Sequence, residues 1–82
     1  MEIIPIGISE VIRAELGRKK MNFAALAEAT GISYDSILRK VGHESRDFRM
    51  GEVQAIAEAL ELPLLELMRR AEEAEKTRQA VA

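Results

Sequence analysis

The sequence contains no cysteine and no tryptophan, and it has a single histidine among its 82 residues. The lack of cysteine excludes disulfide bonds and a thiolate nucleophile, and it leaves no set of Cys and His ligands for a structural zinc ion. Because no nucleophile, base and orienting partner stand at a usable spacing, we expect a protein that is not an enzyme and needs no cofactor or metal. At this length we expect one small domain, stabilised by packing of its apolar side chains.

Long hydrophobic runs are also missing. Apolar runs such as residues 62–68 are far shorter than the ~20 residues that span a bilayer as a helix. The first residues lack the basic stretch and the long apolar segment of a secretion signal. We therefore expect a cytoplasmic protein with no membrane partner.

An excess of positive charge is absent too. The formal net charge is -2, although Lys and Arg supply much of the affinity of a nucleic-acid binder. The charge is distributed unevenly, because residues 13–49 carry a net charge of +3 while residues 1–12 carry -2 and residues 50–82 carry -3. This distribution is expected if one face of the molecule meets DNA and the last third points away or pairs with another subunit.

The first third of the chain has the pattern of a helix. Ile8, Ile12 and Leu16 recur at every fourth position, which is typical of a helix that buries one face. Ser9 is a residue type that caps helix starts well. We predict that the first helix begins behind Ser9 and ends near residues 17–20.

Two further helix starts follow, with a glycine between them. Asn22 is a strong N-cap candidate for a helix over residues 23–30, and Ser33 has the same role for a helix over residues 34–41. Gly31 stands where helices often end in a left-handed residue that glycine adopts without strain. Two helices separated by only three residues predict a compact helix-turn-helix.

The rest of the chain also reads as helical. Apolar residues at helical spacing predict a fourth helix over about residues 50–60, with Arg49 a poor cap before it. Pro63 suits the first turn of a fifth helix that begins near Leu64. We predict an all-α fold, a compact bundle of about five short helices, with an N-terminal arm at residues 1–8 in which the alternation towards Ile8 suits a short strand. The helix-turn-helix domain is expected over residues 9–68 and a helical extension over residues 69–82.

Two stretches of this pattern have a counterpart in a known family. They are MNFAALAEATGISYDSILRKV and, later, VQAIAEALELPLLEL. Residues 16–67 resemble the Cro and lambda-repressor-like helix-turn-helix family of phage and bacterial regulators. The first stretch is similar to that family's second helix, turn and third helix, and the second stretch resembles its fourth helix and the start of its fifth. The resemblance implies sequence-specific binding of double-stranded DNA, commonly by a dimer, and repression or activation of transcription.

Three positions depart from the family pattern. Phe23 stands where the family usually has a glutamine that helps to fix a phosphate or base, and Thr30 stands where it prefers an apolar residue. Lys40 replaces a buried aliphatic residue. Either Leu38 or Val41 takes over that buried position, or the Lys40 ammonium extends towards the phosphates while its stem stays inside. These departures bear on the phosphate contacts and not on the fold.

The resemblance implies that the helix over residues 34–41 enters the major groove and that its outward residues contact bases and backbone. The residues expected to contact DNA are Asn22, Phe23, Ser33, Tyr34, Asp35, Ser36, Leu38, Arg39, Lys40 and Arg46.

Several of these residues also have ordinary structural roles. Arg39 could grip a guanine through its fork, or it could be a solvated arginine paired with Asp35 one turn earlier. Asp35 is expected to favour the helix start and orient Arg39. Tyr34 could touch a phosphate or a thymine methyl group, or it could be plain surface. Ser33 is a cap in either case.

Alternatives remain for the N-terminal arm, for the fifth helix and for the function. The apolar arm tucks across the domain's own core or packs against a second subunit, because such segments are rarely left exposed. The apolar side of the fifth helix could serve a homodimer contact. The competing function is an antitoxin or adaptor module that binds a protein partner through the arm or the last helix, with DNA binding secondary.

Overall fold

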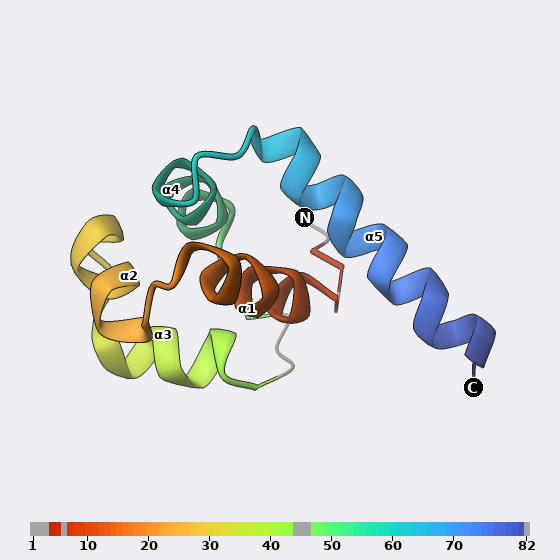
Figure 1. The fold of residues 1–82 in the computed structure, drawn as a ribbon, viewed down its shortest axis with the longest axis horizontal. Helices are drawn as coiled ribbons and strands as arrows, with labels where there is room; N and C mark the ends of the chain where they lie inside the picture. Colours follow the sequence, from red (N-terminus) through yellow and green to blue (C-terminus); the bar gives the residue numbers. More distant parts are fainter. Residues whose placement is uncertain (1–3, 6, 44–46, 82) are drawn as a thin grey trace.

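The computed structural model describes residues 4–5, 7–43 and 47–81, and for residues 78–81 it describes the backbone alone. These residues form five helices, α1 (Ile8–Lys19), α2 (Phe23–Thr30), α3 (Tyr34–Val41), α4 (Met50–Ala59) and α5 (Leu64–Val81), and the described segments contain no strand. Figure 1 shows α1 in the middle of the bundle, with α3 on one side, α4 on the other, and α5 running past it to the C-terminus. The predicted all-α fold is confirmed.

The helix-turn-helix forms where its capping residues predicted it. The Oδ1 atom of Asn22 accepts a hydrogen bond from the Ala25 amide at 2.8 Å, and the Oγ atom of Ser33 accepts one from the Ser36 amide at 3.2 Å. Gly31 closes α2 with a φ angle of +77°, a conformation that only glycine adopts at no steric cost. Three local signals thus set the start and the end of α2 and the start of α3.

Ser9 does not cap α1, and the prediction of this helix start was wrong by two residues. The helix begins at Ile8, the N-cap position is Gly7, and no side chain caps it. Ser9 is fully buried inside the first turn, where its hydroxyl donates a hydrogen bond to the Lys40 carbonyl of α3 at 2.7 Å. The earlier start buries Ile8 completely and gives the hydroxyl a partner across the core.

One apolar core joins all five helices. Its fully buried large side chains include one from each helix: Ile12, Leu26, Ile37, Ile56 and Leu67. Side chains of this kind contribute roughly 1.5–3 kcal/mol each when they are removed from water. The core therefore fixes how α3 sits on the other helices.

The N-terminal arm packs on this same core. Ile4 is 4% exposed and belongs to the buried cluster. Gly7 lies so close to α5 that a Cβ atom there would come within 2.6 Å of the Ala71 carbonyl oxygen. Of the residues expected in a short strand, Ile4, Pro5 and Gly7 are described and none is in a strand, while residues 1–3 and 6 lie outside the described segments.

An ion-pair network ties α5 to α1. The guanidinium of Arg70 contacts Glu66 on α5 and the buried Glu15 on α1, each at 2.7 Å. Glu66 also pairs with Arg69 at 2.8 Å. The hydrogen bonds from Arg69 and Arg70 lower the pKa of Glu66 from 4.5 to about 2.

This network predicts how stability depends on pH. Because the pKa of Glu66 is lower in the folded state, its contribution to stability is complete above about pH 4.5 and is lost as the pH falls towards 2. In Glu66→Gln we therefore expect a lower melting temperature at pH 7 and a weaker decline of Tm between pH 4.5 and 2. Calorimetric or circular-dichroism melting at several pH values measures both. Glu58→Gln, at an exposed glutamate of α4, is the control, and equal pH profiles for the two variants would contradict the prediction.

Candidate nucleic-acid interface

The turn between α2 and α3 is fixed by backbone and side-chain hydrogen bonds. The Gly31 amide donates to the Ala27 carbonyl at 2.9 Å. The hydroxyl of Thr30 donates to the Leu26 carbonyl at 2.8 Å and accepts from the Ile32 amide at 3.2 Å. Thr30, which departs from the family pattern, therefore satisfies a turn amide that an apolar side chain would leave without a partner.

α3 has a buried side and an exposed side. Ile37, Lys40 and Val41 are buried against the other helices. The exposed side carries Ser33, Tyr34, Asp35, Leu38 and Arg39, while Ser36 is half-buried and its Oγ accepts a hydrogen bond from the Ser33 hydroxyl at 3.0 Å. The structure thus brings together on one solvent-facing surface the outward residues that the sequence predicted.

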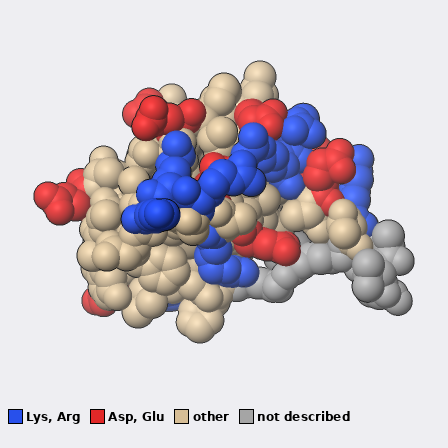
Figure 2. Space-filling view, viewed as in Figure 1, with Lys and Arg blue, Asp and Glu red and all other residues tan. Residues whose placement is uncertain are grey.

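This exposed surface is mixed in character and is not mainly basic. Asp35 lies in the first turn of α3 and Arg39 in the last, with charges that suit the two ends of a helix dipole. Over α3, at the lower left of Figure 2, the surface seen in this view is mostly neither acidic nor basic. The basic side chains form a band across the middle of the same view, over α1 and the near part of α5.

Arg39 does not form the ion pair with Asp35 that was considered from the sequence. Both side chains are exposed, and among the described residues none pairs with Arg39 at salt-bridge distance. Its five N–H donors therefore face water, and its fork is available to a ligand.

Two side chains of α1 hold the C-terminal end of α3 from behind. The last carbonyls of a helix have no partner inside the helix. Here the Ser9 hydroxyl donates to the Lys40 carbonyl and Nη1 of Arg13 donates to the Val41 carbonyl, both at 2.7 Å. The charge of Arg13 also suits the negative end of the α3 dipole. Sequence reasoning missed both contacts, because the partners are 31 and 28 residues apart and no local signal links them.

Lys40 does not extend to the surface as the sequence suggested. It is 8% exposed, and its ammonium lies 2.7 Å from a carboxylate oxygen of Glu52. The same oxygen accepts a hydrogen bond from the Arg49 amide at 2.8 Å and so caps α4, where Arg49 had been expected to leave the start poorly capped. Burial raises the pKa of Glu52, but the hydrogen bonds from Arg49 and Lys40 outweigh it, so that the pKa lies below its ordinary value of 4.5.

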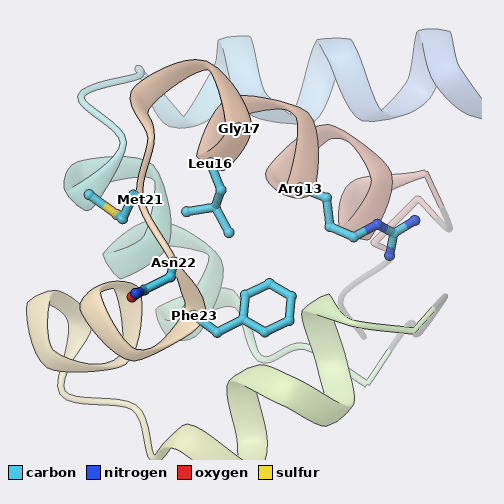
Figure 3. Close-up of a pocket in the computed structure, with 6 residues that line it drawn as sticks. All are labelled: Arg13, Leu16, Gly17, Met21, Asn22 and Phe23. Atoms are coloured by element: carbon cyan, nitrogen blue, oxygen red, sulfur yellow. The ribbon is translucent and has the colours of Figure 1, made fainter.

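Phe23 also points inward. Its ring is half-buried and packs against the core. Figure 3 shows the ring beneath α1, in the space between α1 and α3, beside a hollow of about 380 Å³ that Arg13, Leu16 and Met21 help to line. Phe23 therefore supports the corner between the helices, whereas Asn22 stays exposed at the start of α2.

The remaining basic residues are distributed around this corner. Arg18, Lys19 and Lys20 are exposed at the end of α1, and Arg18 lies 3.3 Å from Glu15. Arg46, which was also predicted to contact DNA, lies outside the described residues. Within the described segments, no helix is both long enough and apolar enough to cross a membrane, and no three potential ligand residues cluster as a metal site.

Comparisons with curated proteins and with solved structures gave different results. No curated protein matches the sequence. Among solved structures, the chain is similar to Streptomyces albus HEPD with substrate 2-hydroxyethylphosphonate and Fe(II) bound, with a TM-score of 0.67 and 22% identity over 82% of this chain. The similarity covers 15% of that protein, and at this identity it shows the fold alone.

The family comparison covers most of the chain. Residues 11–73 match the family described as the Cro/C1-type HTH DNA-binding domain. The matched range includes α2, the Gly31 turn, α3 and α4, and it ends inside α5. The chain therefore belongs to the Cro/C1-type helix-turn-helix DNA-binding domain family.

Proposed function

We propose that this DNA-binding regulator recognises a specific duplex by placing α3 in the major groove. The observation that carries the proposal is the exposed side of α3, where Tyr34, Asp35, Leu38 and Arg39 face solvent over two adjacent turns. A helix presented in this way can lie in the major groove and reach base edges with its outward side chains. The contacts from Ser9 and Arg13 keep its end in a fixed position.

The polar residues of this surface have separate proposed roles. Arg39 grips O6 and N7 of a guanine through two parallel hydrogen bonds. Asp35 acts at the helix start, where its charge is favourable, and limits how α3 approaches the phosphates. Ser33 caps the helix, and with Ser36 it lies where a hydroxyl can also meet the backbone of the duplex. Lys40 and Phe23 are left out of this proposal, because both are turned into the protein.

The start of α2 supplies the proposed phosphate contact. The first amides of a helix have no partner within it, and the helix dipole adds positive potential there. The Asn22 side chain uses only one of these amides, that of Ala25. We propose that free amides of this turn bind a phosphate, with the basic end of α1 nearby adding attraction that does not depend on sequence.

We further propose that the protein binds as a homodimer and acts as a repressor of the phage or Cro-like type. With a formal net charge of -2, one subunit gains limited electrostatic affinity, and a second reading helix compensates for this. Two copies of α3 in successive major grooves stand ~34–36 Å apart, so the site is expected to be a palindrome. A dimer that covers such a site would exclude other proteins from it.

Selection of bound duplexes from a random pool tests this function. We expect enrichment of a palindrome with half-site centres about ten base pairs apart, and a Kd that rises steeply with salt concentration. Absence of any enriched duplex at low salt would contradict the proposal. Such a result, together with a stable heteromer after purification, would support the alternative of a protein-interaction module.

A further inference from the structure

In the part of the chain that the structure describes, two of the three exposed large apolar side chains lie on α3. Among the described residues, the exposed large hydrophobic side chains are Tyr34 (50% exposed), Leu38 (42%) and Leu65 (84%). Tyr34 and Leu38 are four residues apart on one helix, so they are neighbours on the same face, one turn apart. Leu65 lies on α5 and is separate from this pair. The face proposed to meet DNA is thus the face that leaves an apolar pair in water.

The chemistry of this pair points to one kind of group in the groove. Phosphates and most base edges offer charges, donors or acceptors, which a leucine side chain cannot satisfy. The thymine C5-methyl is the apolar group that the major groove presents in an unmodified duplex, and apolar side chains read it by contact. In the view of Figure 2 few charged side chains cover α3, which fits a surface that approaches bases more than phosphates.

We infer that Tyr34 and Leu38 select thymine by packing against its C5-methyl group, next to the base pair that Arg39 reads. The inference rests on the proposed function, in which α3 lies in the major groove. Residues four apart are separated by ~6 Å along a helix, which is less than two base steps of ~3.4 Å. With α3 lying along the groove, the methyl groups therefore belong to adjacent or next-but-one base pairs of each half-site.

Exchange of single methyl groups in the selected duplex tests the inference. Replacing thymine by deoxyuridine removes only the C5-methyl and keeps base pairing. We expect one or two such replacements in each half-site to raise Kd by about fourfold each, the equivalent of ~0.8 kcal/mol for one buried carbon. Changing that thymine to cytosine should weaken binding, and 5-methylcytosine in its place should restore part of the loss.

Protein variants assign the effect to these side chains. We call the factor by which a thymine-to-uracil exchange raises Kd the uracil penalty. In Leu38→Ala, this penalty should fall to near onefold at one of the sensitive positions. Tyr34→Phe keeps the aromatic ring and should keep the penalty at the position that Tyr34 contacts. Leu65→Ala removes an even more exposed leucine from α5 and should leave every uracil penalty unchanged. Because Leu38 is partly exposed, its variant should fold, which circular dichroism checks.

The outcomes separate this inference from the proposed function. A selected duplex whose Kd is insensitive to every thymine-to-uracil exchange would overturn the methyl contact and leave sequence-specific binding intact. A uracil penalty that persists in both Leu38→Ala and Tyr34→Ala would also overturn it. If the random pool yields no bound duplex, the proposed function itself fails.

Discussion

Replacing Arg39 with alanine is expected to raise the Kd for the selected duplex by about 5- to 150-fold, the range that ~1–3 kcal/mol of base discrimination gives. Binding to a scrambled duplex of the same composition should change far less. The reason is that the guanidinium of Arg39 is exposed and has no ion-pair partner among the described residues, so its fork can grip a guanine without giving up an internal contact. Fluorescence anisotropy with both duplexes at one fixed salt concentration measures the ratio.

Two control variants distinguish recognition of a base from electrostatic attraction that does not depend on sequence. Arg39→Lys keeps the charge but loses the planar fork, so it should lose specificity and keep most binding to the scrambled duplex. Arg18→Ala removes one charge from the exposed end of α1 and should weaken both duplexes by a similar factor. An equal loss on both duplexes in Arg39→Ala would show that Arg39 contacts phosphates and does not read bases.

The second large effect concerns the buried ion pair behind α3. In Glu52→Ala we expect the free energy of unfolding to fall by about 2–4 kcal/mol, because the buried ammonium of Lys40 loses its counter-charge and α4 loses its cap. Both roles meet at one carboxylate oxygen, 2.7 Å from Nζ of Lys40 and 2.8 Å from the Arg49 amide. Urea unfolding followed by circular dichroism gives the free energy, and Glu52→Gln, which keeps the cap, should lose less.

Replacing the other partner of the ion pair, Lys40, is expected not to destabilise the protein. Lys40→Met removes the buried charge, restores the apolar residue type that the family uses at this position, and leaves the Glu52 cap in place. Since an apolar residue of similar volume often replaces a buried ion neutrally or favourably, we expect stability equal to or above that of the native chain. A loss in Lys40→Met as large as in Glu52→Ala would contradict this account of the pair.

The parts of the site that the sequence predicted are those set by local interactions. Asn22, Gly31 and Ser33 act on amides or on a turn within three residues, so the bounds of α2 and α3 could be read from the chain. The failures involve distant partners. Ser9 was taken as a cap although its partner is Lys40, 31 residues away.

For Lys40 and Phe23, the direction in which the side chain points could not be predicted from the sequence for the same reason. A lysine in a basic stretch is normally solvated, and only the position of Glu52 on α4, 12 residues later, explains why this one turns inward. Phe23 follows Asn22 at a helix start, but the space beneath α1 that takes its ring exists only after α1, α2 and α3 have packed together. Such choices depend on tertiary contacts that residue spacing does not encode.

Chemical methylation of the selected duplex tests the central claim most directly. Dimethyl sulfate methylates guanine N7, which faces the major groove, and adenine N3, which faces the minor groove. Because we place α3 in the major groove with Arg39 on a guanine, methylation of guanine N7 at one position in each half-site should prevent binding, while adenine N3 methylation there should be tolerated. Inhibition by adenine N3 methylation alone, with every guanine N7 methyl tolerated, would contradict the account.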